Sequence, residues 1–142
     1  MKNFNHFPFI VTNIYKQKKL RYYFYMLKRE YRLKKRSAFT ATYRTGKSIY
    51  KNGITVFCGK PKKENKATKI GFVVSKKIHK RAVKRNRIKR LMRESLRLII
   101  KNNPHFDTKY MSLIFVASTQ LLDKNFNDID TRMQKIMGMI NA

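Results

Sequence analysis

Cysteine, tryptophan and acidic residues are scarce in this sequence of 142 residues, which has one cysteine, no tryptophan and only 7 Asp and Glu. The single Cys58 excludes an internal disulfide and fits a reducing compartment, which predicts a cytoplasmic protein. Cys58 lies in the apolar run "ITVFC", where a small buried side chain is the expected role of a thiol. No apolar run approaches the roughly 18 residues that a membrane-spanning helix needs, and no secretory signal is predicted.

The few candidate catalytic groups are scattered. The seven acids form no cluster, and His6, His79 and His105 lack the spacing of metal ligands, so no protein metal site is predicted. The stretch "ATYRTGKS" (residues 41–48) has a loose phosphate-loop spacing. That motif follows a buried strand and opens a helix, whereas a helix precedes and a strand follows here. The protein alone is therefore not predicted to be a catalyst.

Positive charge is abundant instead: 35 Lys and Arg residues give a formal net charge of +28 and a pI near 10.7. Self-repulsion of this size destabilises a compact chain, so a polyanionic partner is expected to neutralise it. Nucleic acid is the first candidate and an anionic membrane the second. An apolar content of 42% argues against global disorder.

Residues 1–25 differ from the rest of the chain because they hold eight aromatic residues without helical or strand periodicity. Met26 then opens "MLKREYRLKK", which is typical of a basic N-terminus. Our hypothesis is that residues 1–25 are a flexible or artefactual extension, that Met26 is the biological start, and that residues 26–142 form a single domain.

The sequence of residues 26–142 predicts seven secondary-structure elements in the order α-β-β-β-α-β-α. Asn52-Gly53 is a strong signal for a tight hairpin turn, and the runs "ITVFC" and "IGFVVS" have the β-branched character of strands. Helical spacing of apolar residues marks the helices. The expected elements are a helix at 37–44, strands at 49–50, 54–58 and 70–75, a helix at 82–101, a strand at 111–117 and a helix at 126–140.

The helix at 82–101 concentrates the charge, because residues 76–101 contain twelve Lys and Arg but only one acid, Glu94. Arg85, Lys89 and Arg93 fall on one ridge beside the apolar stripe. A solvated face, a membrane-surface helix and a phosphate-binding surface are the three alternatives for this helix. Solvated helices intersperse Glu, and the apolar stripe is needed to cover the sheet, so phosphate binding is favoured. The expected stripe comprises Ile88, Leu91, Met92, Ser95, Leu98 and Ile99.

Composition does not separate DNA from RNA as the partner. Phe39, Tyr43 and Phe57 are candidates for a platform on which unpaired bases stack. Their alternative role, as core aromatics between helix and sheet, is about equally supported by the sequence. Strand alternation places Phe57 on the face opposite Ile54, Val56 and Cys58, which would allow Phe57 to face an open groove.

The stretch "IGFVVSKKIHKRAVKRNRIKRLMRES" (residues 70–95) resembles the signature of the bacterial ribonuclease P protein subunit. That signature is G-x-x-V-S-K-K at a strand end, followed by A-V-x-R-N-R-x-K-R-x-x-R-E. The resemblance extends more weakly from about Leu27 through the last helix. Thr42 departs from it at a position that is usually apolar, and "VASTQ" lacks a basic residue often found there.

The resemblance implies an α+β fold: a two-layer α/β sandwich with a four-stranded sheet and a left-handed β-α-β crossover, like the second domain of a small-subunit ribosomal protein. It also implies an accessory subunit of an endoribonuclease whose catalytic RNA, with Mg²⁺ held mainly by RNA and substrate, removes the 5′ leader of precursor tRNA. One protein per RNA subunit is expected, and no membrane partner.

Carried over position by position, the resemblance assigns two groups of residues. Contacts with the catalytic RNA and with the substrate near the cleavage site are expected from Lys76, Lys77, Arg85, Asn86, Arg87, Lys89, Arg90 and Arg93. A cleft for the single-stranded leader is expected from Phe39, Tyr43, Phe57 and Val73. The alternatives are a ribosomal or other structural RNA-binding protein without a role in catalysis and, third, a basic DNA-binding protein.

Overall fold

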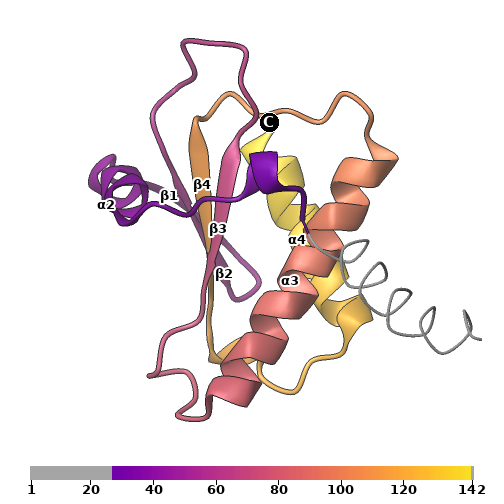
Figure 1. The fold of residues 1–142 in the computed structure, drawn as a ribbon. Coiled ribbons are helices and arrows are strands. Elements are labelled where there is room, and N and C mark those ends of the chain that lie inside the picture. The colour runs from indigo at the N-terminus through magenta and orange to yellow at the C-terminus, as the bar shows by residue number, and fades with distance from the viewer. Residues whose placement is uncertain (1–26, 142) are drawn as a thin grey trace, which may run out of the picture.

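The computed structural model describes residues 27–141 (Figure 1), so the predicted extension at 1–25 and the start at Met26 lie outside the described residues. The predicted element order is confirmed, with two additional short 3₁₀ helices, η1 and η2. The elements are η1 (Arg29–Tyr31), α2 (Arg36–Arg44), β1 (Lys47–Lys51), β2 (Ile54–Cys58), β3 (Lys69–Val73), α3 (Ala82–Asn102), β4 (Ser112–Ala117), η2 (Thr119–Leu121) and α4 (Phe126–Ile140).

Four strands form one mixed sheet in the order β1-β2-β4-β3. The pairs β1–β2 and β2–β4 are antiparallel, and β3–β4 is parallel, with α3 connecting the two parallel strands. In the view of Figure 1 the parallel strands β3 and β4 run downward, β3 lies in front of β4, and α3 lies to the right of both. The connection therefore has the left-handed sense that the resemblance implies, against the usual right-handed preference.

Local sequence explains the two tight turns. Asn52 and Gly53 both have positive φ, 49° and 85°, as a two-residue hairpin turn between β1 and β2 requires. Gly46 has φ 70° directly after α2, where a left-handed residue commonly ends a helix. Because α2 precedes residue 46 and β1 follows it, the order is the reverse of a phosphate loop, as predicted.

The two faces of the sheet are covered differently. In Figure 1, α3 and α4 cover one face, while the shorter α2 packs on the other. Alternate residues of β2 and β4 face α3 and α4, and the side chains at the centre of this core are fully buried. The strand residues in this core are Ile54, Val56, Cys58, Leu113, Phe115 and Ala117.

Details of the helices differ from the prediction. In α3, Ile88, Met92 and Ser95 are buried as expected, but Leu96 completes the buried stripe, and Leu91, Leu98 and Ile99 are only half-buried. The stripe is rotated because α4 packs beside α3.

Two polar contacts involve the first turns of α4. Asp128 lies in the first turn of α4, where the Asn125 side chain accepts a hydrogen bond from its N–H. Asp130 instead accepts a bond of 2.6 Å from the buried Ser95 hydroxyl. Within residues 27–141, no helix has both the length and the apolar character needed to cross a membrane.

Candidate RNA interface

The α2 side of the sheet carries the aromatic residues that the sequence singled out. Phe39 lies over Gly71 so closely that a Cβ built there would approach two ring carbons of Phe39 to 2.7 Å. Tyr43 meets Phe57 edge to face, with 4.9 Å between ring centroids and an interplanar angle of 72°. Tyr43 is 39% exposed and Phe57 is half-buried. These rings are therefore neither core residues nor free surface side chains.

Hydroxyl groups fix α2 on the sheet. Thr42 is the one buried residue of α2, and its Oγ1 donates to the Ala38 carbonyl at 2.7 Å and lies 2.6 Å from Ser112 Oγ. Thr45 donates to the carbonyl of Cys58. These bonds satisfy the polar groups at the contact, which explains how a threonine occupies a position where an apolar residue was expected. Burial also raises the pKa of the Tyr43 phenol, which stays neutral at physiological pH.

Arg85 and Arg87, the two arginines of the Arg-Asn-Arg segment, make bonds that hold the N-terminal part of α3 in place. Arg85 Nη1 donates to the carbonyls of His79 and Lys80, at 2.9 and 2.6 Å, and so braces the loop before α3. Arg87 Nη2 donates to the Lys124 carbonyl at 3.0 Å and ties α3 to the segment before α4. A guanidinium has five N–H donors, so neither set of bonds exhausts its capacity for phosphate.

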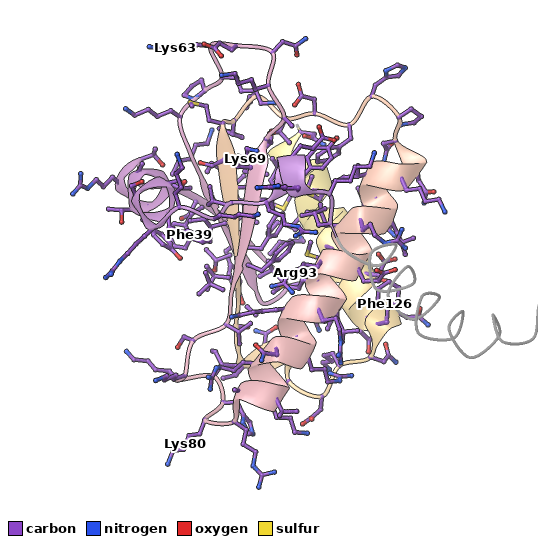
Figure 2. The ribbon with its side chains drawn as sticks, viewed as in Figure 1. Phe39, Lys63, Lys69, Lys80, Arg93 and Phe126 are labelled. Atoms are coloured by element: carbon purple, nitrogen blue, oxygen red, sulfur yellow. The ribbon has the colours of Figure 1, made fainter. Side chains whose placement is uncertain are left out.

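Asn86, between these two arginines, and Arg90 and Arg93, which follow them, occupy exposed positions of α3. They line a cavity beside the outer edge of β3 that Phe39 and Gly71 also line. Figure 2 shows Phe39 on the α2 side of the sheet and Arg93 on the α3 side, flanking β3. The Arg93 guanidinium carbon is 5.8 Å from the centroid of the Phe72 ring, within the range of a cation–π contact.

The remaining predicted residues frame these two groups. Lys76 and Lys77 are exposed in the connector after β3, where Ser75 Oγ accepts the Lys77 N–H at 2.9 Å. Lys89 is half-buried on α3, and Val73 is half-buried on the sheet face that carries Phe57. Glu94 forms a two-point ion pair with Arg97, at 2.7 and 3.1 Å. The single acid of the basic stretch is therefore already engaged.

Comparison with known proteins gives the family. The Ribonuclease P family model matches residues 27–141. The chain belongs to the ribonuclease P protein family. A ribonuclease P protein component from an Exiguobacterium strain is 45% identical over 76 residues, which is 54% of this chain and 64% of that protein. The one from Clostridium novyi is 33% identical over 118 residues, which is 81% of this chain and 100% of that protein.

Solved ribonuclease P proteins share the fold. The Staphylococcus aureus RNase P protein superposes with a TM-score of 0.64 at 27% identity, covering 79% of this chain and 98% of that one. The α+β architecture expected from the sequence resemblance is thereby confirmed.

Sequence reasoning singles out Lys47 as a surface lysine that contacts phosphate, but it missed Tyr50 and the contact of two lysines with Tyr110 in this ribonuclease P family member. Tyr50 is 58% exposed on β1, on the sheet face that carries Phe57. Lys47 and Lys109 lie over the ring of the buried Tyr110, with ammonium nitrogens 4.8 and 5.5 Å from its centroid. Periodicity within one strand places Tyr50 on a face but not beside its neighbours, because those neighbours come from other strands.

In this family member the Cys58 thiol is buried, and the possible metal-ligating side chains of residues 27–141 do not cluster. Burial raises the pKa of the Cys58 thiol, which the nearby charges of Lys47 and Lys109 only partly oppose. A thiol with a raised pKa is a poor nucleophile, in agreement with the core role expected for Cys58. Among residues 27–141, no three His, Cys, Asp or Glu side chains gather in a metal-binding group.

Proposed function

We propose that this chain is the protein subunit of ribonuclease P, the endoribonuclease that removes the 5′ leader of precursor tRNA. In this proposal it binds the catalytic RNA and the single-stranded leader in the cytoplasm, with one protein per RNA. The supporting observation is the cavity at the edge of β3, which Phe39 lines together with Arg90 and Arg93 of α3, in a chain that belongs to the family. The Tyr43–Phe57 pair lies further along the same α2 face.

Each half of this surface suits a different part of an RNA. The rings of Phe39, Tyr43 and Phe57 provide flat apolar surface on which unpaired bases stack, and such stacking tolerates many sequences. Arg90 and Arg93, with Asn86 between the braced arginines, offer donors for phosphate oxygens. A leader strand on the sheet would lie next to a helix that holds the catalytic RNA.

The chemistry is assigned to the RNA. When bound, Mg²⁺ supplies charge neutralisation and an activated water at the scissile phosphodiester, and the proposal places these ions on RNA and substrate oxygens. The chain's own share is electrostatic, because its +28 charge offsets the repulsion between two polyanions, the catalytic RNA and its substrate. The protein is therefore expected to matter most when Mg²⁺ is scarce.

Reconstitution tests this function. The full chain is mixed with a bacterial ribonuclease P RNA and a precursor tRNA at low Mg²⁺, and release of the intact leader is measured. Cleavage at the mature 5′ end that depends on the protein is expected. A structural RNA-binding protein would coat both RNAs without restoring cleavage, and that outcome would contradict the proposal.

A second measurement tests leader binding separately from assembly. The holoenzyme should bind leader-bearing tRNA more tightly than mature tRNA, because only the former reaches the aromatic residues. Equal affinity for the two tRNAs would contradict leader binding even if the chain stimulated cleavage. The mass of the reconstituted complex tests the expected ratio of one protein to one RNA.

A further inference from the structure

Tyr50 extends the line of aromatic side chains beyond the positions that the family resemblance assigns. The register pairs Ser48 with Phe57 and Tyr50 with Thr55, so Tyr50 and Phe57 are diagonal neighbours on one sheet face. Diagonal neighbours in an antiparallel pair lie about 7–8 Å apart, within reach of aromatic side chains. Tyr43, Phe57 and Tyr50 therefore follow one another from α2 toward the outer edge of the sheet.

The Tyr50 side chain is both exposed and held in place. Its ring is 58% exposed, and its hydroxyl accepts a hydrogen bond of 3.2 Å from Gln120 Nε2. Gln120 belongs to η2 and lies 3.5 Å, through Oε1, from Arg132 Nη1, which also donates to the Asn52 carbonyl. A ring oriented by its hydroxyl loses less conformational freedom when a ligand packs on it. Apart from Tyr43 and Tyr50, the large exposed apolar side chains among residues 27–141 are Val83, Met111 and Met139, and these three lie outside this sheet row.

The sheet offers a continuous path to this ring. Tyr50, Thr55, Val116 and Val73 are paired in register across all four strands, and the last three are half-buried rather than buried. Three inter-strand steps of about 4.8 Å give a row roughly 14 Å long. Its far end at Val73 leads within four residues to the exposed Lys76 and Lys77.

We propose that Tyr50 is a further RNA-binding residue that stacks on an unpaired base of the leader, beyond the base that contacts Phe57. The strand would cross the sheet from the lysines after β3 to the outer edge at β1. This inference rests on the proposed function, since it takes the leader as the occupant of the face. A sheet that stacks successive bases on aligned aromatic side chains is a common mode of single-stranded RNA recognition.

A tryptophan placed at this position reports binding directly, because the sequence contains no tryptophan. In a holoenzyme reconstituted with the Tyr50→Trp variant, emission should be quenched by leader-bearing tRNA and unchanged by mature tRNA. A Met139→Trp variant on the exposed side of α4 serves as the control and should respond to neither. An unchanged signal from Trp at position 50, or an equal response to both tRNAs, would overturn the inference.

Leader length gives the second test. Tyr50→Ala should weaken binding of long-leader precursors about 5-fold or more, and Tyr50→Phe, which keeps the ring, should bind nearly normally. As the leader is shortened one nucleotide at a time, the effect of Tyr50→Ala should vanish before that of Phe57→Ala. The melting temperature of each variant and its affinity for the RNA subunit show whether the fold is intact.

The two variants separate this inference from the function on which it rests. If Phe57→Ala weakens binding and Tyr50→Ala has no effect at any leader length, Tyr50 is not a leader contact, although the face still binds the leader. If neither variant affects binding, the leader-binding function itself fails. Loss of affinity for mature tRNA to the same extent would also refute a leader contact at Tyr50.

Discussion

The two faces of the sheet are built from alternate residues of the same strands, yet they differ in how completely their side chains are buried. On the α3/α4 face, Val56 and Phe115 are completely buried. On the α2 face, the neighbouring Thr55, Phe57 and Val116 remain half-buried. One face is a closed core, whereas the other carries apolar side chains that nothing in residues 27–141 fully covers.

Helix length explains the difference. The 9 residues of α2 span about 14 Å, whereas the 21 residues of α3 span about 32 Å. On the α2 face, Ile114 is buried, and Phe39 lies over Gly71 in the same row. The neighbouring row, from Tyr50 to Val73, lies beyond the row that Phe39 covers. A short helix on one face thus leaves room for a ligand without weakening the core on the other.

The largest effect on stability should come from truncating a core side chain on the closed α3/α4 face. Phe115→Ala removes a fully buried ring that stacks on Phe72 with 5.5 Å between centroids, and is expected to lower the free energy of unfolding by about 3–5 kcal/mol. Val116→Ala, one residue on, should cost only about 1 kcal/mol because Val116 is half-buried and the change removes fewer atoms. Urea unfolding measures both, and equal losses would show that the two faces do not differ in packing.

Gly71→Ala tests how tightly Phe39 packs on the α2 face of the sheet. In Gly71→Ala, the added methyl group meets the Phe39 ring, so the ring must move and the free energy of unfolding should fall by about 1–3 kcal/mol. Precursor binding should weaken as well, because Phe39 is displaced. Gly138→Ala is the control: its Cβ meets nothing within 4 Å in α4, so it should stabilise the helix by roughly 0.5–1 kcal/mol. An unperturbed Gly71→Ala variant would contradict the tight contact.

The sequence predicts the elements well because their signals are local. The Asn52-Gly53 turn and the boundaries of β2 follow from residues within a few positions of each other, and the structure confirms both. The helix expected at 82–101 is α3, Ala82–Asn102. Apolar periodicity fixes such helices because it reflects one face of one element.

Contacts between distant elements explain what sequence reasoning missed. Thr42 departs from the expected apolar residue, and its partner Ser112 lies 70 positions away. The Arg85 side chain turns back to the carbonyls of His79 and Lys80, which no helical ridge predicts. Tyr50 looks like an ordinary surface residue until the register places it diagonally from Phe57. These features depend on pairing and side-chain direction, which periodicity does not carry.

Phe57→Ala tests whether the open face binds RNA. Loss of one stacking ring should weaken precursor binding by about 1–3 kcal/mol while affinity for the RNA subunit is unchanged. Phe57→Tyr keeps the ring and should retain precursor affinity. Binding of labelled precursor and of labelled RNA subunit gives the two values. Equal losses in both assays would show that Phe57 acts through the fold, through its contact with Tyr43, and not through the leader.

Arg90→Ala should have the smallest effect, because it removes one exposed charge from a chain with 35 Lys and Arg residues. If Arg90 contacts a phosphate, affinity for RNA should fall and its dependence on salt should flatten by roughly one counterion. Lys135→Ala removes an equal charge from the exposed side of α4 and should leave the slope unchanged. Titrations at several salt concentrations give both slopes. If the two variants shift the slope equally, the charge of α3 acts as part of a general field rather than through contacts beside β3.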